Sequence, residues 1–295
     1  MHLLLDTDIG TDVDDALALG VLLGSPEVDL AGITTVYGDT LLRARLASRL
    51  LGIARPGFTV PIMVGEQNTR SGRPVWWPGH EGQLYDDLDA EPIDTTADGV
   101  AFLVKTARRL RGELDVLAIG PLTNIAAALD ADPEFAANVR QLVIMGGDFS
   151  QEGRVPEHNF LSDVAAAQRV FDSEAAIVVG GLDLTTQIEV GESDLDRIKT
   201  SGDFGLALSD EVSQWWTFHG HAWNHPHDPI LALWLLDPTL FETTRSRVLI
   251  DDDGLSIDTP DEHGNVVVLR GMRKDEVTTA LVDRICAASA ARSAV

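Results

Sequence analysis

Residues 3–17 read Leu3-Leu4-Leu5-Asp6-Thr7-Asp8-Ile9-Gly10-Thr11-Asp12-Val13-Asp14-Asp15-Ala16-Leu17. The leucines form a short apolar run typical of a buried strand, and a helical pattern begins near the end of the stretch. Five aspartates stand between them within ten residues, whereas the first basic side chain of the chain is Arg43. A strand, a loop and a helix in this order predict the start of a βαβ unit, with carboxylates at the carboxyl end of its strand.

So many neighbouring carboxylates require a physical explanation. Like charges a few ångströms apart raise one another's pKa values or share a cation. Calcium accepts about six to eight oxygen ligands in irregular geometry, so the cluster predicts a hard-cation site. Helix capping is the alternative, since Asp12 or Asp14 is suitably placed to be an N-cap and acids are favoured in a first helical turn. Capping explains at most two of the five aspartates.

The chain continues to alternate between strands and helices. Strands are predicted at residues 3–5, 30–36, 60–64, 114–119, 141–145 and 175–179. Helices are predicted between them at residues 14–23, 40–53, 99–111, 124–131 and 163–172. This alternation predicts an α/β fold with an open, mostly parallel sheet and helices on both faces. Ligands bind such sheets beyond the carboxyl ends of the strands.

The last third of the chain has a different pattern. Residues 193–236 are predicted to be largely helical, and residues 274–291 to form a final helix. Residues 248–257 and 266–269 predict a β-hairpin that turns through residues 261–264. The sequence has no internal repeat or linker, so residues 1–295 are expected to form one domain.

Composition argues against several classes of protein. The net charge of -25 argues against nucleic acid or an anionic membrane as a partner, because both require a basic surface. Cys286 is the only cysteine, which excludes an intramolecular disulfide and a cysteine metal cluster. The sequence lacks the ~20-residue apolar run of a membrane span, and its N-terminus does not resemble a secretory signal. A soluble cytoplasmic protein is therefore expected.

A magnesium-dependent phosphatase of the haloacid dehalogenase type is one interpretation of the first loop. Such phosphatases also place an Asp-x-Asp motif after the first strand. However, they usually have Thr or Val where this chain has Gly10, and they have no use for the adjacent Asp14-Asp15 pair.

Residues 6–19 more closely resemble the N-terminal signature of the inosine-uridine-preferring nucleoside hydrolase family, Asp-Thr-Asp-Pro-Gly-x-Asp-Asp-Ala. Here Ile9 replaces the proline, and two extra residues precede the aspartate pair, so Asp12 has no counterpart. The resemblance implies a Rossmann-like fold in which Asp8 ligates calcium and acts as general base on a metal-bound water. It also implies that Asp15 ligates the metal and that Asp14 holds the ribose hydroxyls.

Two further segments resemble the family at the ends of predicted strands. In Ile33-Thr34-Thr35-Val36-Tyr37-Gly38-Asp39, Asp39 replaces an asparagine that contacts the sugar. Asp39 is therefore expected to bind a ribose hydroxyl, to approach the metal or to cap the next helix. In Gly120-Pro121-Leu122-Thr123-Asn124, the resemblance implies that the backbone carbonyl of Thr123 ligates calcium. Thr123 or Asn124 is also a candidate N-cap.

The later segments supply the other candidate residues. Pro156-Glu157-His158-Asn159-Phe160 resembles the family's ribose-binding Glu-x-Asn pair, and an extended backbone would direct Glu157 and Asn159 to one side. His225-Pro226-His227-Asp228-Pro229 resembles its His-Asp-Pro segment, which implies that Asp228 completes the calcium shell and that His227 lies near the leaving base. Asp228 before a proline is equally typical of a helix N-terminus.

Aromatic and histidine residues are candidates for contact with the base. The resemblance implies that His227 is the candidate acid that protonates the leaving base, and His80, in Trp76-Trp77-Pro78-Gly79-His80, resembles a second family histidine near the base, which makes both histidines catalytic candidates. Either tryptophan is able to stack on a base or to serve in packing. Zinc is an alternative for the four closely spaced histidines, but residues two apart on a helix do not face one another. Those four are His219, His221, His225 and His227.

These observations predict calcium-dependent hydrolysis of the N-glycosidic bond of ribonucleosides to ribose and free base. Replacement of Asp8 is then expected to abolish most turnover, as for any general base. The alternatives are the phosphatase and a non-catalytic protein that binds calcium and ribose. The resemblance further implies a role in purine or pyrimidine salvage and assembly as a homodimer or homotetramer.

Overall fold

The computed structural model describes residues 1–150 and 153–290. Its strands are β1 (His2–Thr7), β2 (Asp29–Thr35), β3 (Ile62–Val64), β4 (Leu114–Ala118), β5 (Val139–Met145), β6 (Ile177–Gly180), β7 (Val190–Gly191), β8 (Trp223–Asn224), β9 (Phe241–Ile250), β10 (Ser256–Pro260) and β11 (Val266–Met272). Its helices are α1 (Asp14–Leu23), α2 (Thr40–Ala54), α3 (Gly99–Arg109), α4 (Thr123–Ala131), α5 (Phe135–Asn138), α6 (His158–Ser162), α7 (Val164–Phe171), α8 (Leu182–Thr185), α9 (Glu192–Lys199), α10 (Asp203–His219), α11 (His227–Leu236) and α12 (Lys274–Ala290), with short 3-10 turns η1 (Leu88–Ala90) and η2 (Pro238–Leu240).

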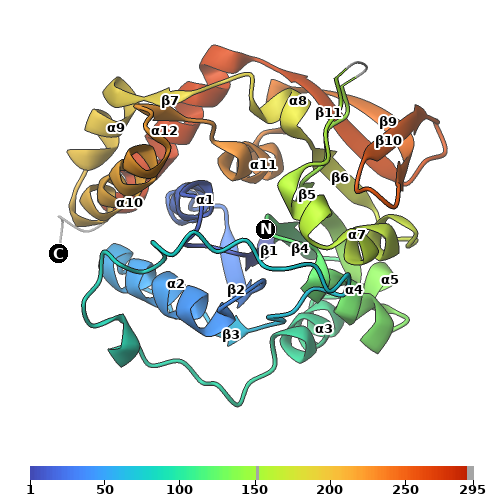
Figure 1. The fold of residues 1–295 in the computed structure, drawn as a ribbon, viewed down its shortest axis with the longest axis horizontal. Coiled ribbons are helices and arrows are strands. Elements are labelled where there is room, and N and C mark those ends of the chain that lie inside the picture. Colours follow the sequence, from blue (N-terminus) through green and yellow to red (C-terminus); the bar gives the residue numbers. More distant parts are fainter. Residues whose placement is uncertain (151–152, 291–295) are drawn as a thin grey trace.

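The main sheet has the strand order β10-β9-β11-β6-β5-β4-β1-β2-β3 (Figure 1). Neighbouring strands from β11 to β3 are parallel, whereas β9 runs antiparallel to both of its neighbours. From β1 the chain moves to β2 and β3, and it then returns to place β4 on the other side of β1. The boundary between β1 and β4 is therefore a topological switch point, where open α/β sheets bind their ligands.

Helices cover both faces of the sheet (Figure 1). Leu3 and Leu5 of β1 pack with α1, α10, α11 and α12, while Leu4 between them packs on the opposite face with α3, α4, α5 and α7. A strand that is covered on both sides needs apolar residues at successive positions, which explains its uninterrupted leucine run. The prediction of an open, mostly parallel sheet with helices on both faces is confirmed.

The predicted C-terminal hairpin is wrong in its pairing. β9 turns into β10 through residues 251–255, and Leu249 faces Ile257 across this turn. Residues 261–264 instead connect β10 to β11, two strands that lie on opposite sides of β9. β11 also pairs in parallel with β6, so the C-terminal strands extend the main sheet. An alternating apolar pattern shows that a strand forms but does not identify the strand beside it.

The helical prediction for residues 193–236 is correct only in part. The region contains α9, α10 and α11, but β8 and its flanking residues separate the last two helices. α12 begins at Lys274 as predicted, and its predicted end at residue 291 lies outside the described residues. Among the described helices, none combines the length and apolar character needed to cross a membrane.

Candidate active site

A cavity of about 290 Å³ lies at the switch point, beyond the carboxyl ends of β1, β4 and β5. Asp8 follows β1, Ile119 follows β4 and Met145 ends β5, and all three line the cavity. Much of the remaining lining consists of carboxylates and aromatic rings. We call the carboxylates the acidic cluster, which contains Asp8, Asp12, Asp14, Asp15 and Asp228. The aromatic lining residues are Trp76, His158, Trp215, His219 and His227.

Two helix N-termini bring the innermost carboxylates together. Asp14 and Asp15 begin α1, and Asp228 is the second residue of α11. The three buried side chains each offer an oxygen that lies within 4.8 Å of the other two. The backbone N–H of Asp228 donates to Asp14 Oδ2 over 3.3 Å, and the Thr7 hydroxyl donates to Asp15. Within residues 1–150 and 153–290, no other set of three acidic, histidine or cysteine side chains lies as close together.

Burial makes this cluster electrostatically unfavourable without a counter-ion. It raises the pKa values of Asp14, Asp15 and Asp228 well above the usual range for aspartate, and repulsion from neighbouring aspartates raises them further. A divalent cation with oxygen ligands would remove this cost. The close donor set consists of carboxylates alone, which fits a hard cation such as calcium or magnesium better than zinc.

The other two carboxylates of the cluster belong to the loop between β1 and α1. Asp8 lies against Gly120, where an added Cβ would come within 2.7 Å of Asp8 Oδ1, so the close approach requires glycine. Burial raises the pKa of Asp8, and it raises the pKa of Asp12 to about 7. The N-cap of α1 is Val13, and no side chain caps it, so the predicted N-cap role of Asp12 or Asp14 is wrong. Asp14 does lie in the first helical turn, where acids are favoured.

The segment around Glu157 differs from the predicted extended conformation, because α6 begins directly after this residue. The buried Glu157 carboxylate accepts the backbone N–H groups of Gly147, Asn159 and Phe160 over 2.9, 2.7 and 3.1 Å. It therefore acts as a helix cap and does not line the cavity. Asn159 does line it.

The Asn159 side chain is fixed by the ends of two strands. Its Nδ2 donates to the carbonyl of Ile119 over 2.9 Å and to that of Met145 over 3.2 Å. These contacts use both amide hydrogens, so Oδ1 is the atom left to accept a hydrogen bond from a ligand. Asn159, which is predicted to bind ribose, therefore lines the cavity with this oxygen still able to accept a hydrogen bond.

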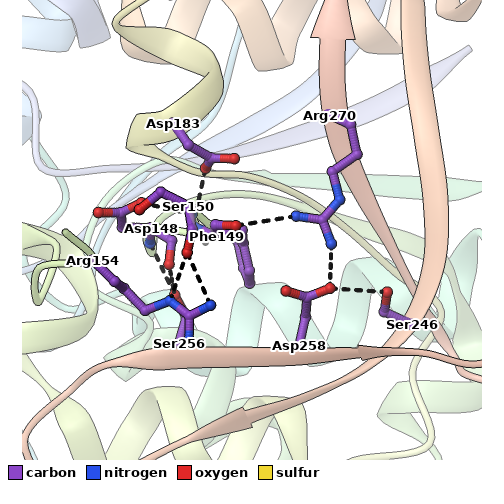
Figure 2. Close-up of polar contacts among 9 residues, drawn as sticks. All are labelled: Asp148, Phe149, Ser150, Arg154, Asp183, Ser246, Ser256, Asp258 and Arg270. Carbon is purple, nitrogen blue, oxygen red and sulfur yellow. Dashed lines mark hydrogen bonds and ion pairs between the residues drawn. The ribbon is translucent and has the colours of Figure 1, made fainter. Parts of the chain in front are cut away.

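The C-terminal strands hold the loop between β5 and α6, as Figure 2 shows. Ser256 Oγ accepts the backbone N–H of Asp148 over 2.9 Å and donates to the carbonyl of the same residue over 2.8 Å. Arg270 donates to the carbonyl of Phe149 over 3.4 Å and pairs with the buried Asp258. The strands whose pairing was not predicted thus support a loop that leads into the cavity.

The two predicted catalytic histidines occupy different surroundings. His227 lines the cavity, its Nδ1 lies 2.6 Å from the Thr185 hydroxyl, and burial lowers its pKa to about 3. The His227 imidazole is therefore neutral near pH 7. His80 does not line the cavity; its Nε2 donates to the carbonyl of Thr11 over 2.8 Å, and its ring lies 4.8 Å from that of Phe218.

Two other predicted residues also lie outside the cavity lining. Asp39 is exposed and caps α2 by accepting the backbone N–H of Leu42 over 2.9 Å, which is the alternative predicted for it. Thr123 is the first residue of α4, and its hydroxyl donates to Asp163 over 2.7 Å. The predicted capping roles of Thr123 and its neighbour are wrong, because Leu122 is the N-cap.

Several aromatic lining residues were not predicted. His158 packs edge-on against Trp76 with 5.6 Å between ring centroids, and Trp215 packs against His219 over 4.0 Å. His158 lies inside the Glu-x-Asn segment, so its position was an available signal. Trp215 belongs to a long helix, and nothing in its local pattern indicates the cavity. Trp77 does not line the cavity and lies beneath the guanidinium of Arg43.

The four histidines proposed as zinc ligands do not form a metal site in the described part of the chain. Their rings instead follow one another with an intervening tryptophan. His221 and His225 flank Trp223 with centroid separations of 4.8 and 4.9 Å, and His225 lies 5.6 Å from His227. The row ends at the cavity.

An open, mostly parallel sheet with a carboxylate-lined cavity at its switch point is typical of α/β proteins that bind a small ligand there. The chain belongs to the inosine-uridine preferring nucleoside hydrolase family, whose family model matches residues 3–289. The predicted family and enzyme class are thereby confirmed, and the phosphatase interpretation is wrong.

The relatives and solved structures agree with this assignment. Probable uridine nucleosidase 2 of Arabidopsis thaliana is 34% identical over 273 residues, which cover 86% of this chain and 83% of that protein. A pyrimidine-specific ribonucleoside hydrolase of Enterobacter sp. (strain 638) is 29% identical over 86% of this chain and 85% of its own. A plant nucleoside hydrolase structure has a TM-score of 0.85 and 28% identity, and it covers 97% of this chain and 98% of its own. The purine-preferring ribonucleoside hydrolase of Gardnerella vaginalis has a TM-score of 0.84 and 25% identity, with 99% and 100% covered.

Proposed function

We propose that the protein hydrolyses the N-glycosidic bond of ribonucleosides to ribose and free base in a calcium-dependent reaction. The observation that supports this most directly is the convergence of Asp14, Asp15 and Asp228 within 4.8 Å at a cavity that also presents an asparagine amide and aromatic rings. Carboxylates suit a cation and sugar hydroxyls, whereas ring faces suit a base. The cavity therefore offers complementary chemistry to each part of a ribonucleoside.

The residues proposed to hold calcium are Asp8, Asp15, Asp228 and the backbone carbonyl of Thr123. The buried carboxylates among them support the proposal, because their repulsion is relieved by a cation. Magnesium demands a more regular set of ligands and keeps more of its water, so irregular protein-derived donors favour calcium. When bound, calcium would make a water molecule easier to deprotonate near neutral pH.

Asp8 is proposed to take the proton from the attacking water. It stands at the switch point beside Gly120, and its side chain reaches the cavity. Asp14 and Asn159 are proposed to hold the ribose hydroxyls, because both line the same cavity. Use of the 2'-hydroxyl would favour ribonucleosides over deoxyribonucleosides.

The departing base is proposed to lie among the aromatic lining residues. Trp76 and Trp215 offer ring faces, and the neutral imidazole of His227 offers a hydrogen bond without a net charge. The relatives are named for uridine, pyrimidine and purine substrates, so we propose the ribonucleoside class without a base preference. The homodimer or homotetramer and the role in salvage remain predictions.

A nucleoside panel tests the proposal. Purified protein is stripped with a chelator, supplied with calcium, magnesium or neither, and incubated with inosine, uridine and 2'-deoxyuridine. Free reducing sugar is expected from the ribonucleosides in calcium, with little in the chelator and much less from deoxyuridine. Tight nucleoside binding without any release of sugar would identify a binding protein instead. Equal rates with and without chelator would contradict the metal requirement.

A further inference from the structure

A buried arginine contacts the loop that carries the acidic cluster, and the proposed reaction assigns it no role. Arg43 lies on α2, and its side chain is 0% exposed. Its Nη1 donates to the backbone carbonyl of Asp8, to that of Ile9 over 3.0 Å and to the Thr11 hydroxyl over 3.1 Å. Its Nε donates to the carbonyl of Tyr37 over 2.7 Å. One guanidinium thus joins the loop after β1 to the loop after β2.

This environment is unusual for a buried cation. In the described chain, no carboxylate oxygen lies within 4.0 Å of the Arg43 nitrogens, and its Nη2 has no hydrogen-bond partner. Buried charges are normally paired, since their removal from water is costly. Arg43 is balanced instead by carbonyl dipoles and by more distant aspartates, and its attraction opposes the rise in pKa that burial causes at Asp8 and Asp15.

The surroundings of Arg43 fix its orientation. The centroid of the Trp77 ring lies 4.9 Å from the guanidinium carbon. Tyr37, whose carbonyl accepts the hydrogen bond from Arg43 Nε, has a left-handed φ of 69°. A non-glycine residue keeps this conformation only where its surroundings impose it. Leu46, one turn further along α2, occupies the space beside Gly10, where an added Cβ would come within 2.4 Å of Leu46 Cδ1. α2 therefore contacts the loop through two side chains.

We propose that Arg43 is a positioning residue for residues 8–11, holding this loop in the shape that directs Asp8 and Asp12 into the cavity. The N–H groups of the planar guanidinium form a fork of donors that fixes the backbone of the loop. The positive charge of Arg43 offsets repulsion among the aspartates. Lysine is a point charge on a flexible stem and cannot reproduce the fork. The effect on turnover and on cation binding rests on the proposed function, whereas the effect on the loop backbone does not.

The test compares Arg43→Lys and Arg43→Met with Arg45→Met. Arg45 lies on the same helix and pairs with the exposed Asp89, which makes it a matched control. Both Arg43 variants are expected to lose about 100-fold in kcat, because a displacement of about 1 Å in a reacting group has this effect. KM is expected to change less than about threefold, since Asn159 and the aromatic lining lie on other segments. The control is expected to keep native kcat.

Two further measurements separate positioning from general stability. Terbium luminescence, with terbium standing in for calcium, is expected to show about tenfold weaker binding in both Arg43 variants, as for other residues that support metal ligands. Amide hydrogen exchange is expected to accelerate in the peptide covering residues 6–17, with native rates in α7 and β5. If Arg43→Met fails to fold, Thr11→Val removes one acceptor of the fork and is expected to accelerate exchange in the same peptide.

The outcomes are distinct. Unchanged exchange in residues 6–17 of the Arg43 variants, or of Thr11→Val where they do not fold, overturns the positioning role whatever the activity. Native kcat in Arg43→Lys together with a large loss in Arg43→Met also overturns it, because charge alone would then suffice. A native protein that neither cleaves ribonucleosides nor binds terbium contradicts the proposed function, and the exchange experiment still decides the role of Arg43.

Discussion

Asp8 is the residue on which the proposed chemistry depends most. It lies at the end of β1 against Gly120, with its side chain in the cavity. Asp8→Ala is expected to lower kcat about 1,000-fold or more, because a general base and a cation ligand are lost together. Steady-state kinetics on the best ribonucleoside measure the change. Asp39→Asn is the control, because Asp39 is exposed and asparagine is an equally good helix cap. Near-normal turnover in Asp8→Ala would refute the assignment.

His227 and His80, the two predicted catalytic histidines, differ in their position relative to the cavity. His227 lines the cavity and is neutral, with a pKa of about 3, whereas His80 is hydrogen-bonded to the Thr11 carbonyl outside it. His227→Ala is therefore expected to lower kcat about 100-fold on inosine and uridine, and His80→Ala less than about threefold. Because His227 does not titrate between pH 5 and 8, the pH profile in that range is expected to keep its shape in His227→Ala.

Kinetics of the two variants on both nucleosides provide the measurement. Equal and small effects would show that neither histidine assists the leaving base. A larger effect for His80→Ala would reverse the assignment that the cavity lining favours.

Many of the residues that line the cavity were predictable from the sequence, and the features that were not predictable have a common physical cause. A motif indicates which residue type follows a strand, so Asp8, Asn159 and Asp228 were predictable. It does not indicate whether a carboxylate is already occupied by backbone donors, as in Glu157. Arg43 is 35 residues from Asp8 in the chain, and only the packing of α2 brings it to the loop.

At the scale of elements, α6 depends on the cap that Glu157 provides. Three backbone N–H groups donate to its carboxylate, and the helix carries His158 and Asn159 into the cavity. Glu157→Ala is expected to lower the free energy of unfolding by about 2 kcal/mol, since a cap and charge-assisted hydrogen bonds are lost. Its kcat is expected to fall with the displacement of Asn159. Urea denaturation and kinetics measure both effects.

Glu157→Gln distinguishes this interpretation from direct contact with ribose. Glutamine has a carbonyl oxygen but no charge, so it is expected to retain part of the cap and part of the lost stability. If Glu157 binds the sugar directly, the glutamine variant should raise KM while leaving the free energy of unfolding unchanged.

The elements themselves were predictable to different degrees. The central parallel strands are buried on both faces, so their apolar runs stand out in the sequence, as in Leu3-Leu4-Leu5. The C-terminal strands alternate, and their pattern left open which strand lies beside β9. Local sequence patterns could not predict that the N-termini of α1 and α11 converge, because Asp14 and Asp228 are 214 residues apart in the chain. The family resemblance supplied that pairing, whereas local patterns did not.

At the scale of the whole molecule, one sheet includes strands from both ends of the chain, from β1 to β11. The sheet has one hydrophobic cluster on each face, and the helices that cover that face contribute to it. We therefore propose one domain and expect a single cooperative unfolding transition, with equal calorimetric and van't Hoff enthalpies. Differential scanning calorimetry in excess chelator measures both, and two resolved transitions would contradict the proposal.

Buried carboxyl groups outside the loop and helix termini of the acidic cluster make the stability of the whole molecule depend on pH. Burial raises the pKa of Asp6 from 3.8 to about 7 and that of Glu211 from 4.5 to about 7. A carboxyl whose pKa is higher in the folded state binds more protons when folded, so its contribution is present at low pH and is lost as pH rises through 7. Without calcium, the free energy of unfolding is therefore expected to rise by about 1 kcal/mol for each such group as pH falls from 8.5 to 6.5. Tm is expected to rise with it.

The window stops at pH 6.5 because His227 acts in the opposite sense. Its pKa falls from 6.5 to about 3 on folding, so below pH 6.5 the unfolded chain binds the extra proton and stability is lost. Excess calcium is expected to raise Tm most at pH 8.5, where protons compete least for the carboxylates. Thermal scans at three pH values, with chelator and with calcium, measure both trends. A Tm in chelator that falls between pH 8.5 and 6.5 would show that the buried carboxylates are not the groups that limit stability.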